Sequence, residues 1–185
     1  MCSCEHVVMT EPPVSRAFNG HLSTWPHGHM RYRMQQDQLV YSDEKKQDRY
    51  DRAYMRMASE WSKLSHCSRK KVGALIVKEG MIISDGYNGT PTGFPNDCED
   101  AEGLTHWYVL HAEANAIMKV ARSTNNARGA TLYLTHSPCK ECSKLIMQAG
   151  IKRLVYLDAY KDPSGLELLQ NGGLMVHKLE ELPSR

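Results

Sequence analysis

The feature that most constrains the fold is a set of metal-binding side chains in two separate segments. His111 stands two residues before Glu113, and Cys139 and Cys142 lie in the motif Pro-Cys-Lys-Glu-Cys at residues 138–142. One imidazole and two thiolates suit Zn²⁺ better than Mg²⁺ or Ca²⁺. A structural zinc site normally takes four protein ligands, whereas a catalytic site takes three and leaves one position to water. The pattern therefore predicts a fold that brings both segments to one catalytic zinc ion.

Both donor segments are expected at the beginning of helices. Alanines favour a helix over residues 111–122, and a second predicted helix over residues 139–149 ends before Gly150. Cys139 and Cys142 then lie one turn apart on the same helix face. The partial positive charge at a helix N-terminus favours the thiolate forms that bind metal.

Glu113 is expected to carry protons and not to bind the metal. Residues two positions apart in a helix point in directions about 200° apart, so Glu113 and His111 do not share a face. A carboxylate beside metal-activated water can act in general acid–base catalysis, which typically contributes about 10²–10⁴-fold in rate. Cys-x-x-Cys alone is more often a structural zinc knuckle or a redox pair, and His-x-Glu alone occurs by chance in many helices. The prediction therefore depends on their ordered combination.

The bulk composition limits the classes of function. The chain has 185 residues, a formal net charge of +2 and six cysteines. This length suits one domain with a substantial core, and the near-neutral charge argues against a nucleic-acid or membrane partner. There is no apolar run of the roughly 20 residues that a transmembrane helix needs, and we find no export signal. We therefore expect a reducing, cytoplasmic location.

Two regions differ in their sequence pattern. Residues 1–43 contain prolines, glycines and scattered histidines without a sustained apolar period, which predicts an N-terminal extension that is flexible at its start. From Tyr50 to Leu64, apolar residues recur every three or four positions and predict an amphipathic helix. We therefore place the domain that carries the donors at residues 44–185.

Strands and helices alternate through this second region. The runs at residues 72–77 and 81–84 flank a short turn with a glycine and predict a β-hairpin. Residues 86–105 hold a dense cluster of turn residues and predict a loop. Further strands are expected at residues 131–135, 153–157 and 174–177, and a further helix at 164–170. This alternation predicts an α/β fold with a layered sheet.

Longer matches point to a family. Residues 49–176 resemble the deoxycytidylate (dCMP) deaminases, including bacterial relatives from the late-competence operon. The matching segments include Gly-Tyr-Asn-Gly-Thr-Pro-Thr-Gly at 86–93, His-Ala-Glu-Ala-Asn-Ala-Ile at 111–117 and Ser-Pro-Cys-Lys-Glu-Cys-Ser-Lys-Leu-Ile at 137–146. His-x-Glu followed by Pro-Cys-x-x-Cys is typical of zinc-dependent nucleobase deaminases in general. The Gly-Tyr-Asn-Gly loop separates dCMP deaminases from most of the others.

The resemblance implies both a fold and a reaction. The fold is a cytidine-deaminase-like three-layer α/β/α sandwich around a mixed five-stranded sheet. The reaction is dCMP + H₂O → dUMP + NH₃, which supplies dUMP for thymidylate synthesis. The resemblance also implies one catalytic Zn²⁺, a nucleotide substrate and a homo-oligomer, which is commonly a hexamer in relatives.

The same resemblance assigns substrate-binding roles. Asn88 falls where relatives contact the sugar, and Ala112 falls in the matched helix start beside the predicted zinc ligand. Arg69, Tyr160 and Lys161 are the candidates for binding the phosphate. An alternative for Arg69 is that it belongs to a solvated run of basic residues at positions 69–71.

Two departures from the family pattern leave alternatives open. His136 occupies a position that is usually apolar in relatives, and it either changes a wall of the site or points to solvent. Cys67 and Cys98 match positions that bind a second, structural zinc in some relatives, with His66 or His106 as further ligands. Two buried, reduced cysteines are the simpler expectation.

Two other functions fit part of the pattern. A deaminase of the same fold could act on another cytosine nucleoside, guanine or a tRNA adenosine, and equal turnover of deoxycytidine and dCMP would point to such an enzyme. A zinc-stabilised interaction module would use His111, Cys139 and Cys142 only to hold the fold. Such a module would need a fourth protein ligand in place of water.

Overall fold

The computed structural model describes residues 28–180 and 182, and their side chains from residue 43 onward. The chain divides into Met1–Val40 and Tyr41–Arg185, and helix α1 (Gly28–Ser62) crosses that division. Periodicity indicated a helix only from Tyr50, but α1 begins much earlier. No proline lies between Pro26 and the end of α1, and its Met, Arg and Gln residues favour a helix even without an apolar period. The expected flexibility of the first residues lies outside the described part. The domain boundary at residue 43 stays a prediction.

Five strands form one mixed sheet in the order β2-β1-β3-β4-β5. The strands are β1 (Gly73–Lys78), β2 (Met81–Tyr87), β3 (Thr131–His136), β4 (Arg153–Asp158) and β5 (Met175–Lys178). β1 pairs antiparallel with β2 and β3, whereas β3, β4 and β5 run parallel. The turn between β1 and β2 is Glu79-Gly80, and both residues have positive φ (51° and 77°), the form that matches the strand twist. The predicted hairpin and mixed five-stranded sheet are confirmed.

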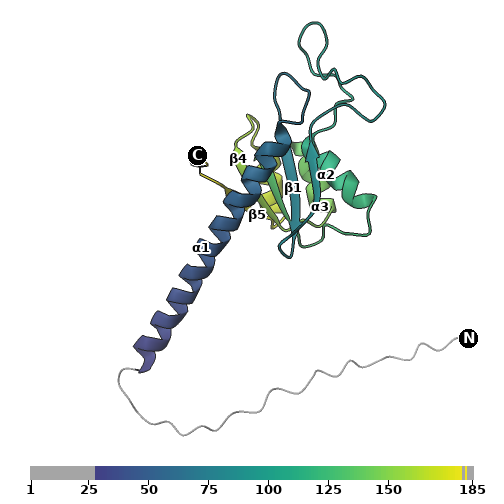
Figure 1. Ribbon diagram of the computed structural model, residues 1–185. Coiled ribbons are helices and arrows are strands. Elements are labelled where there is room, and N and C mark those ends of the chain that lie inside the picture. Colours follow the sequence, from purple (N-terminus) through teal and green to yellow (C-terminus); the bar gives the residue numbers. More distant parts are fainter. Residues whose placement is uncertain (1–27, 181, 183–185) are drawn as a thin grey trace, which may run out of the picture. The chain divides into compact units, whose positions relative to one another are not determined.

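Helices cover both faces of the sheet and complete the predicted three-layer α/β/α sandwich (Figure 1). On one face, α2 (Ala112–Ala121), α3 (Lys140–Gln148) and α4 (Ser164–Asn171) share a buried cluster with Leu132 and Leu134 of β3. On the other face, α1 packs its Met55 and Ala58 against Tyr133 of the same strand. This division follows from the alternation of side chains along a strand. No helix in the described part of the chain is both long and apolar enough to cross a membrane.

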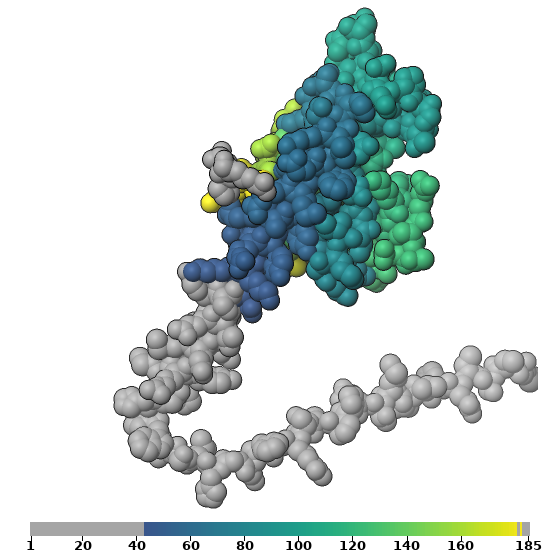
Figure 2. Space-filling view, viewed as in Figure 1, coloured from purple at the N-terminus to yellow at the C-terminus, as the bar shows by residue number. Residues whose placement is uncertain are grey.

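Strand β2 extends further than the sequence predicted. Gly86 and Tyr87 were expected in a loop, but they pair with Ala74 and Gly73 of β1. The turn-like composition has another cause, since a Cβ at Gly86 would lie 2.3 Å from the carbonyl oxygen of Ala112. The glycine therefore lets the beginning of α2 contact the strand directly. The remaining loop between β2 and α2, drawn in teal, projects from the domain in Figure 2.

A buried ion pair fastens α1 to the sheet. Asp51 of α1 is only 2 % exposed, and Arg153 of β4 donates two hydrogen bonds to its carboxylate. The hydroxyl group of Tyr133 and the side chain of Gln47 donate to the same carboxylate at 2.8 and 2.9 Å. Burial alone would raise the pKa of Asp51, but these hydrogen bonds together hold that pKa below its usual value. The charge is thus compensated inside the protein.

Candidate metal centre

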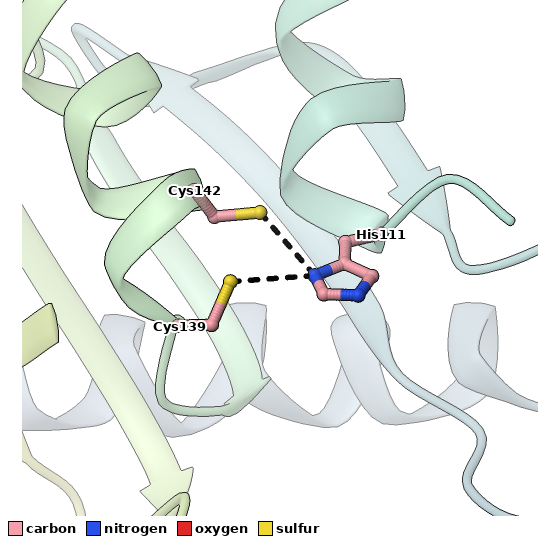
Figure 3. Close-up of side chains that lie close together, drawn as sticks. All are labelled: His111, Cys139 and Cys142. Atoms are coloured by element: carbon pink, nitrogen blue, oxygen red, sulfur yellow. Dashed lines mark hydrogen bonds between the residues drawn. The ribbon is translucent and has the colours of Figure 1, made fainter. Parts of the chain in front are cut away.

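Three metal-binding side chains converge as the sequence predicted. Nδ1 of His111 lies 3.4 Å from Sγ of Cys142 and 3.6 Å from Sγ of Cys139 (Figure 3). A ring nitrogen carries at most one proton, so at most one hydrogen atom is available for these two contacts. A tetrahedral zinc ion with Zn–S near 2.3 Å and Zn–N near 2.0–2.1 Å would place sulfur and nitrogen about 3.5 Å apart. The donor set therefore fits Zn²⁺ in both chemistry and spacing.

Two helix N-termini bring these donors together. His111 is the N-cap residue of α2, and Cys139 is the N-cap residue of α3, both with extended backbones. Cys142 follows in the first turn of α3 and is buried. The side chain and the amide of Ser143 both donate to the carbonyl oxygen of Cys139, which fixes the backbone there. The predicted meeting of two helix ends is therefore observed.

The pKa values of the two cysteines shift in opposite directions. Hydrogen bonds from Cys142 and His111 lower the pKa of Cys139 to about 3, so Cys139 is the thiolate. The pKa of Cys142 is raised, because it donates to Cys139 and is buried. A zinc ion would take the place of the thiol proton and of these hydrogen bonds, since both cysteines bind zinc as thiolates.

Glu113 lies beside the three donors but does not belong to their group. Of the His, Cys, Asp and Glu side chains that the structure describes, His111, Cys139 and Cys142 form the one group that could hold a metal ion. Glu113 is 4 % exposed, and burial raises its pKa above the usual value for a glutamate. A buried carboxyl group with a raised pKa is suited to take up and pass on a proton in general acid–base catalysis.

A cleft of about 360 Å³ opens onto this group. Every residue that we predicted for the site lines the cleft except Cys142, which is buried beside it. The predicted residues in the lining are Arg69, Asn88, His111, Ala112, Glu113, Cys139, Tyr160 and Lys161. The fold thus brings residues that are far apart in the sequence, from Arg69 to Lys161, to one cleft. Their individual roles stay predictions.

Asn88 has a structural task in addition to its predicted sugar contact. Its Oδ1 accepts a hydrogen bond from the amide of Val72 at 2.8 Å, and its Nδ2 donates to the carbonyl oxygen of Lys70 at 2.8 Å. These bonds hold the segment before β1 against the Gly-Tyr-Asn-Gly loop. An amide group has two N–H donors, and these contacts take one of them, so a donor remains for a ligand in the cleft.

His136 forms part of the cleft wall and does not point to bulk solvent. Its side chain is buried and lines the cleft. Its Nδ1 lies 3.2 Å from the carbonyl oxygen of Thr135 and 3.4 Å from Oδ2 of Asp158. Both neighbours are acceptors, so Nδ1 carries the proton of the neutral ring. Burial and the nearby charge of Lys70 hold the pKa of His136 below its usual value.

The expectation for Cys67 and Cys98 was wrong. The two residues form a disulfide bond, so they are neither reduced thiols nor thiolates available to a second zinc ion. Cys98 begins a small hairpin in which Glu99 pairs with Thr105 and the amide of His106 donates to the carbonyl oxygen of Cys98. The side chain of Glu99 accepts hydrogen bonds from Ser68, next to Cys67, which brings the two cysteines together. Cysteine spacing alone could not reveal this hairpin.

Sequence reasoning also missed several residues of the cleft. Glu99, Thr105, Val109 and Ser137 line it, and the first three do not stand out in the sequence. Ser137 had one signal, since it directly precedes the Pro-Cys motif. Its Oγ accepts a hydrogen bond of 2.7 Å from the amide of Tyr160, which holds that predicted phosphate-site residue near the metal centre.

Comparisons with known proteins agree with this geometry. Residues 48–158 match the family described as "Cytidine and deoxycytidylate deaminase zinc-binding region". The deoxycytidylate deaminase of Enterobacteria phage T4 is 37% identical over 158 residues, covering 62% of this chain and 82% of that protein. ComE operon protein 2 of Bacillus subtilis is 40% identical over 121 residues, covering 63% of this chain and 64% of that protein.

A solved structure extends the likeness to three dimensions. The dCMP deaminase of cyanophage S-TIM5, in complex with dCMP and dUMP, has a TM-score of 0.67 and 48% sequence identity. The match covers 68% of this chain and 93% of that one. The family match spans the three donors and Glu113. This chain therefore belongs to the cytidine and deoxycytidylate deaminase family that this zinc-binding region defines.

Proposed function

We propose that this protein hydrolyses dCMP to dUMP and ammonia with one Zn²⁺ held by His111, Cys139 and Cys142. The observation that carries the proposal is the group of three donors in a cleft that a buried glutamate also lines. Similar proteins from phage T4 and cyanophage S-TIM5 are named as deaminases of dCMP, and the second was solved with dCMP and dUMP.

Zinc supplies the nucleophile when it is bound, because it lowers the pKa of a coordinated water from 15.7 to about 7. The protein must then move protons. Glu113 takes one proton of the attacking water and passes it to N3 of the pyrimidine, and it then moves the proton of the new hydroxyl group on C4 to the amino group that leaves, so that C4 becomes a carbonyl carbon. A C–O bond forms at C4 and the C–N bond breaks, so that ammonia and dUMP result. Burial of Glu113 keeps bulk water from competing for that proton.

The substrate's other groups meet the rim of the cleft. Arg69 and Lys161 supply positive charge for the 5′-phosphate, and Tyr160 lies beside Lys161. The free amide hydrogen of Asn88 would reach the sugar, and Ala112 lies next to His111 at the beginning of α2. Removal of the phosphate should therefore weaken binding more than it slows the chemical step.

An absorbance assay tests this proposal with dCMP, cytidylate and deoxycytidine, each measured with and without a zinc chelator. We expect dCMP to be turned over with the highest kcat/KM and the chelator to abolish turnover. Equal kcat/KM for deoxycytidine and dCMP would contradict the phosphate site, while lack of turnover of all three substrates would contradict the proposal itself.

The proposal also includes the enzyme's setting. We infer a cytoplasmic location, since the expected reaction uses a soluble nucleotide, and a homo-oligomer, which would be a hexamer if the family resemblance holds. Size-exclusion chromatography with light scattering would measure the oligomeric state directly, and a monomer at micromolar concentration would contradict it.

A further inference from the structure

Two short segments form one side of the cleft. The first, which we call the cation turn, comprises residues 67–70 and includes Arg69 and Lys70. The second is the 98–106 hairpin, in which the amide of Asp100 donates to the carbonyl oxygen of Leu104 at 2.9 Å. Both segments contribute side chains to the lining of the cleft.

Glu99 of the 98–106 hairpin holds the backbone of the cation turn. Its Oε2 accepts hydrogen bonds from the amide and the hydroxyl group of Ser68, both at 3.0 Å. Its Oε1 accepts from the amide of Arg69 at 3.3 Å. Because two consecutive amides point at one carboxylate, the direction of the chain at Arg69 is fixed. The bonds from Ser68, and then from Arg69, lower the pKa of Glu99, so it is ionised.

Two further ties join the same segments. Nη1 of Arg69 lies 3.4 Å from Oγ1 of Thr105 and donates to it, so the guanidinium group itself touches the hairpin. The disulfide bond between Cys67 and Cys98 links the residues that directly precede Ser68 and Glu99. The disulfide bond and the carboxylate of Glu99 therefore hold the cation turn and the 98–106 hairpin together at neighbouring residues.

The position of Glu99 is unexpected for a site that takes an anion. A free carboxylate in this cleft would repel a phosphate group. Here three hydrogen bonds engage the carboxylate oxygens, and the result of those bonds is that Arg69 and Lys70 stay at the rim. Loss of the negative charge of Glu99 alone should strengthen phosphate binding, whereas loss of its hydrogen bonds to the cation turn should weaken it.

We propose that Glu99 is a positioning residue that holds the cation turn so that Arg69 and Lys70 face the 5′-phosphate of the substrate. This inference rests on the proposed function. It predicts that Glu99 affects the binding of the nucleotide through its phosphate and leaves the chemistry at C4 unchanged.

Kinetics of Glu99→Gln with dCMP and deoxycytidine test the proposal. We expect KM for dCMP to rise about 5- to 20-fold, since two or more hydrogen bonds are weakened, whereas kcat for dCMP and kcat/KM for deoxycytidine change less than twofold. Glu99→Asp, which keeps the charge and both acceptor oxygens, should recover part of the lost affinity. The matched control is Glu102→Gln, the same charge change on the same hairpin at an exposed residue outside the cleft lining.

Reduction of the disulfide tests the second tie. Dithiothreitol passes two electrons to the Cys67–Cys98 bond, each sulfur gains a proton, and the reagent becomes a cyclic disulfide. We expect reduction to raise KM for dCMP about 2- to 3-fold in the wild type, and by a larger factor in Glu99→Gln, where the carboxylate no longer holds the turn. The Cys67→Ser/Cys98→Ser variant should not respond to dithiothreitol, and zinc content is measured throughout.

Several results would overturn the proposal. If Glu99→Gln lowers KM for dCMP or leaves it unchanged, the carboxylate acts only through its charge or not at all. If dCMP and deoxycytidine lose kcat/KM equally, Glu99 supports the fold or the metal site and not the phosphate-facing cations. If the wild-type enzyme treats dCMP and deoxycytidine alike, the phosphate site of the proposed function fails, and the role of Glu99 fails with it.

Discussion

The two faces of the sheet use polar residues in opposite ways. On the α1 face, Asp51 is surrounded by partners from the protein, with Arg153, Tyr133 and Gln47 all donating to it. On the face covered by α2, α3 and α4, the donors and Glu113 converge on a cleft and need a metal ion and a substrate to complete their contacts. Buried polar groups that are satisfied internally stabilise a fold, whereas those left facing a cleft are available for chemistry.

The largest effect should come from Glu113 on the metal face. Glu113→Gln removes the proton carrier, so kcat for dCMP should fall about 10²–10⁴-fold, as measured by the absorbance change. Zinc content by mass spectrometry and the midpoint of thermal unfolding should stay at wild-type values, because Glu113 does not belong to the donor group. Loss of zinc, or activity within a few-fold of wild type, would contradict the assigned role.

The α1 face should respond in stability and not in activity. Asp51→Ala leaves the half-buried guanidinium group of Arg153 without its carboxylate partner, and breaking a buried ion pair typically costs about 3–5 kcal/mol. Urea denaturation would measure this loss in the free energy of unfolding. The kcat/KM of the folded variant and its zinc content should remain within twofold of wild type.

A control for this prediction lies on the same helix. Asp48→Ala breaks the partly exposed ion pair with Arg52, and ion pairs at the protein surface contribute less than about 1 kcal/mol. Equal destabilisation by Asp48→Ala and Asp51→Ala would show that the burial of the Asp51 network is irrelevant. A large loss of zinc in Asp51→Ala would show that the two faces are not independent.

A close contact on the metal face should control zinc affinity. A Cβ at Gly165 of α4 would lie 2.4 Å from the carbonyl oxygen of Pro138 and 2.9 Å from the carbonyl carbon of Cys139. Gly165→Ala must therefore displace a zinc donor, and we expect affinity to fall about 10- to 100-fold, as for other residues that orient metal ligands. Competition with a chromogenic chelator measures this change without using activity.

Gly172, just beyond the other end of α4, provides the matched substitution. A Cβ there would lie 2.4 Å from Cε of Met147, which is the mobile end of a flexible side chain. Gly172→Ala should therefore leave zinc affinity within about twofold of wild type. Equal losses in both variants would mean that α4 acts only through general stability.

The smallest effect is the pH dependence of the α1 face. The folded-state pKa of Asp51 is lowered, so the folded state binds fewer protons than the unfolded state below the ordinary aspartate pKa of about 3.9. The contribution of ionised Asp51 to the free energy of unfolding is therefore complete above that pH, and it is lost as the pH falls through the folded-state pKa. The difference in unfolding free energy between wild type and Asp51→Asn should be constant from pH 7 to 5 and narrow toward pH 3. A difference that widens in acid would contradict this assignment.

Local patterns in the sequence predicted the metal face well. The donors, their places at helix N-termini and the strand–helix alternation all depend on residues that are close in the sequence. The resemblance to dCMP deaminases implied the mixed five-stranded sheet, which the structure has. It also implied the substrate-binding residues, which lie around one cleft.

Contacts between distant residues could not be predicted in the same way. Asp51 and Arg153 lie 102 positions apart, and neither differs in the sequence from any other charged residue. Glu99 and the Cys67–Cys98 disulfide depend on a hairpin without a strong strand pattern. The early start of α1 was missed because helix propensity without an apolar period gives no signal of burial.

Return of zinc to chelator-stripped wild-type protein tests the central claim most directly. Zinc is added in steps while dCMP deamination is followed by absorbance. We predict that activity is absent without metal, rises in proportion to added zinc and saturates at about one equivalent per chain, the number that one three-donor group can hold. Turnover in the stripped protein, or a zinc-loaded protein that does not deaminate dCMP, would contradict a catalytic zinc site.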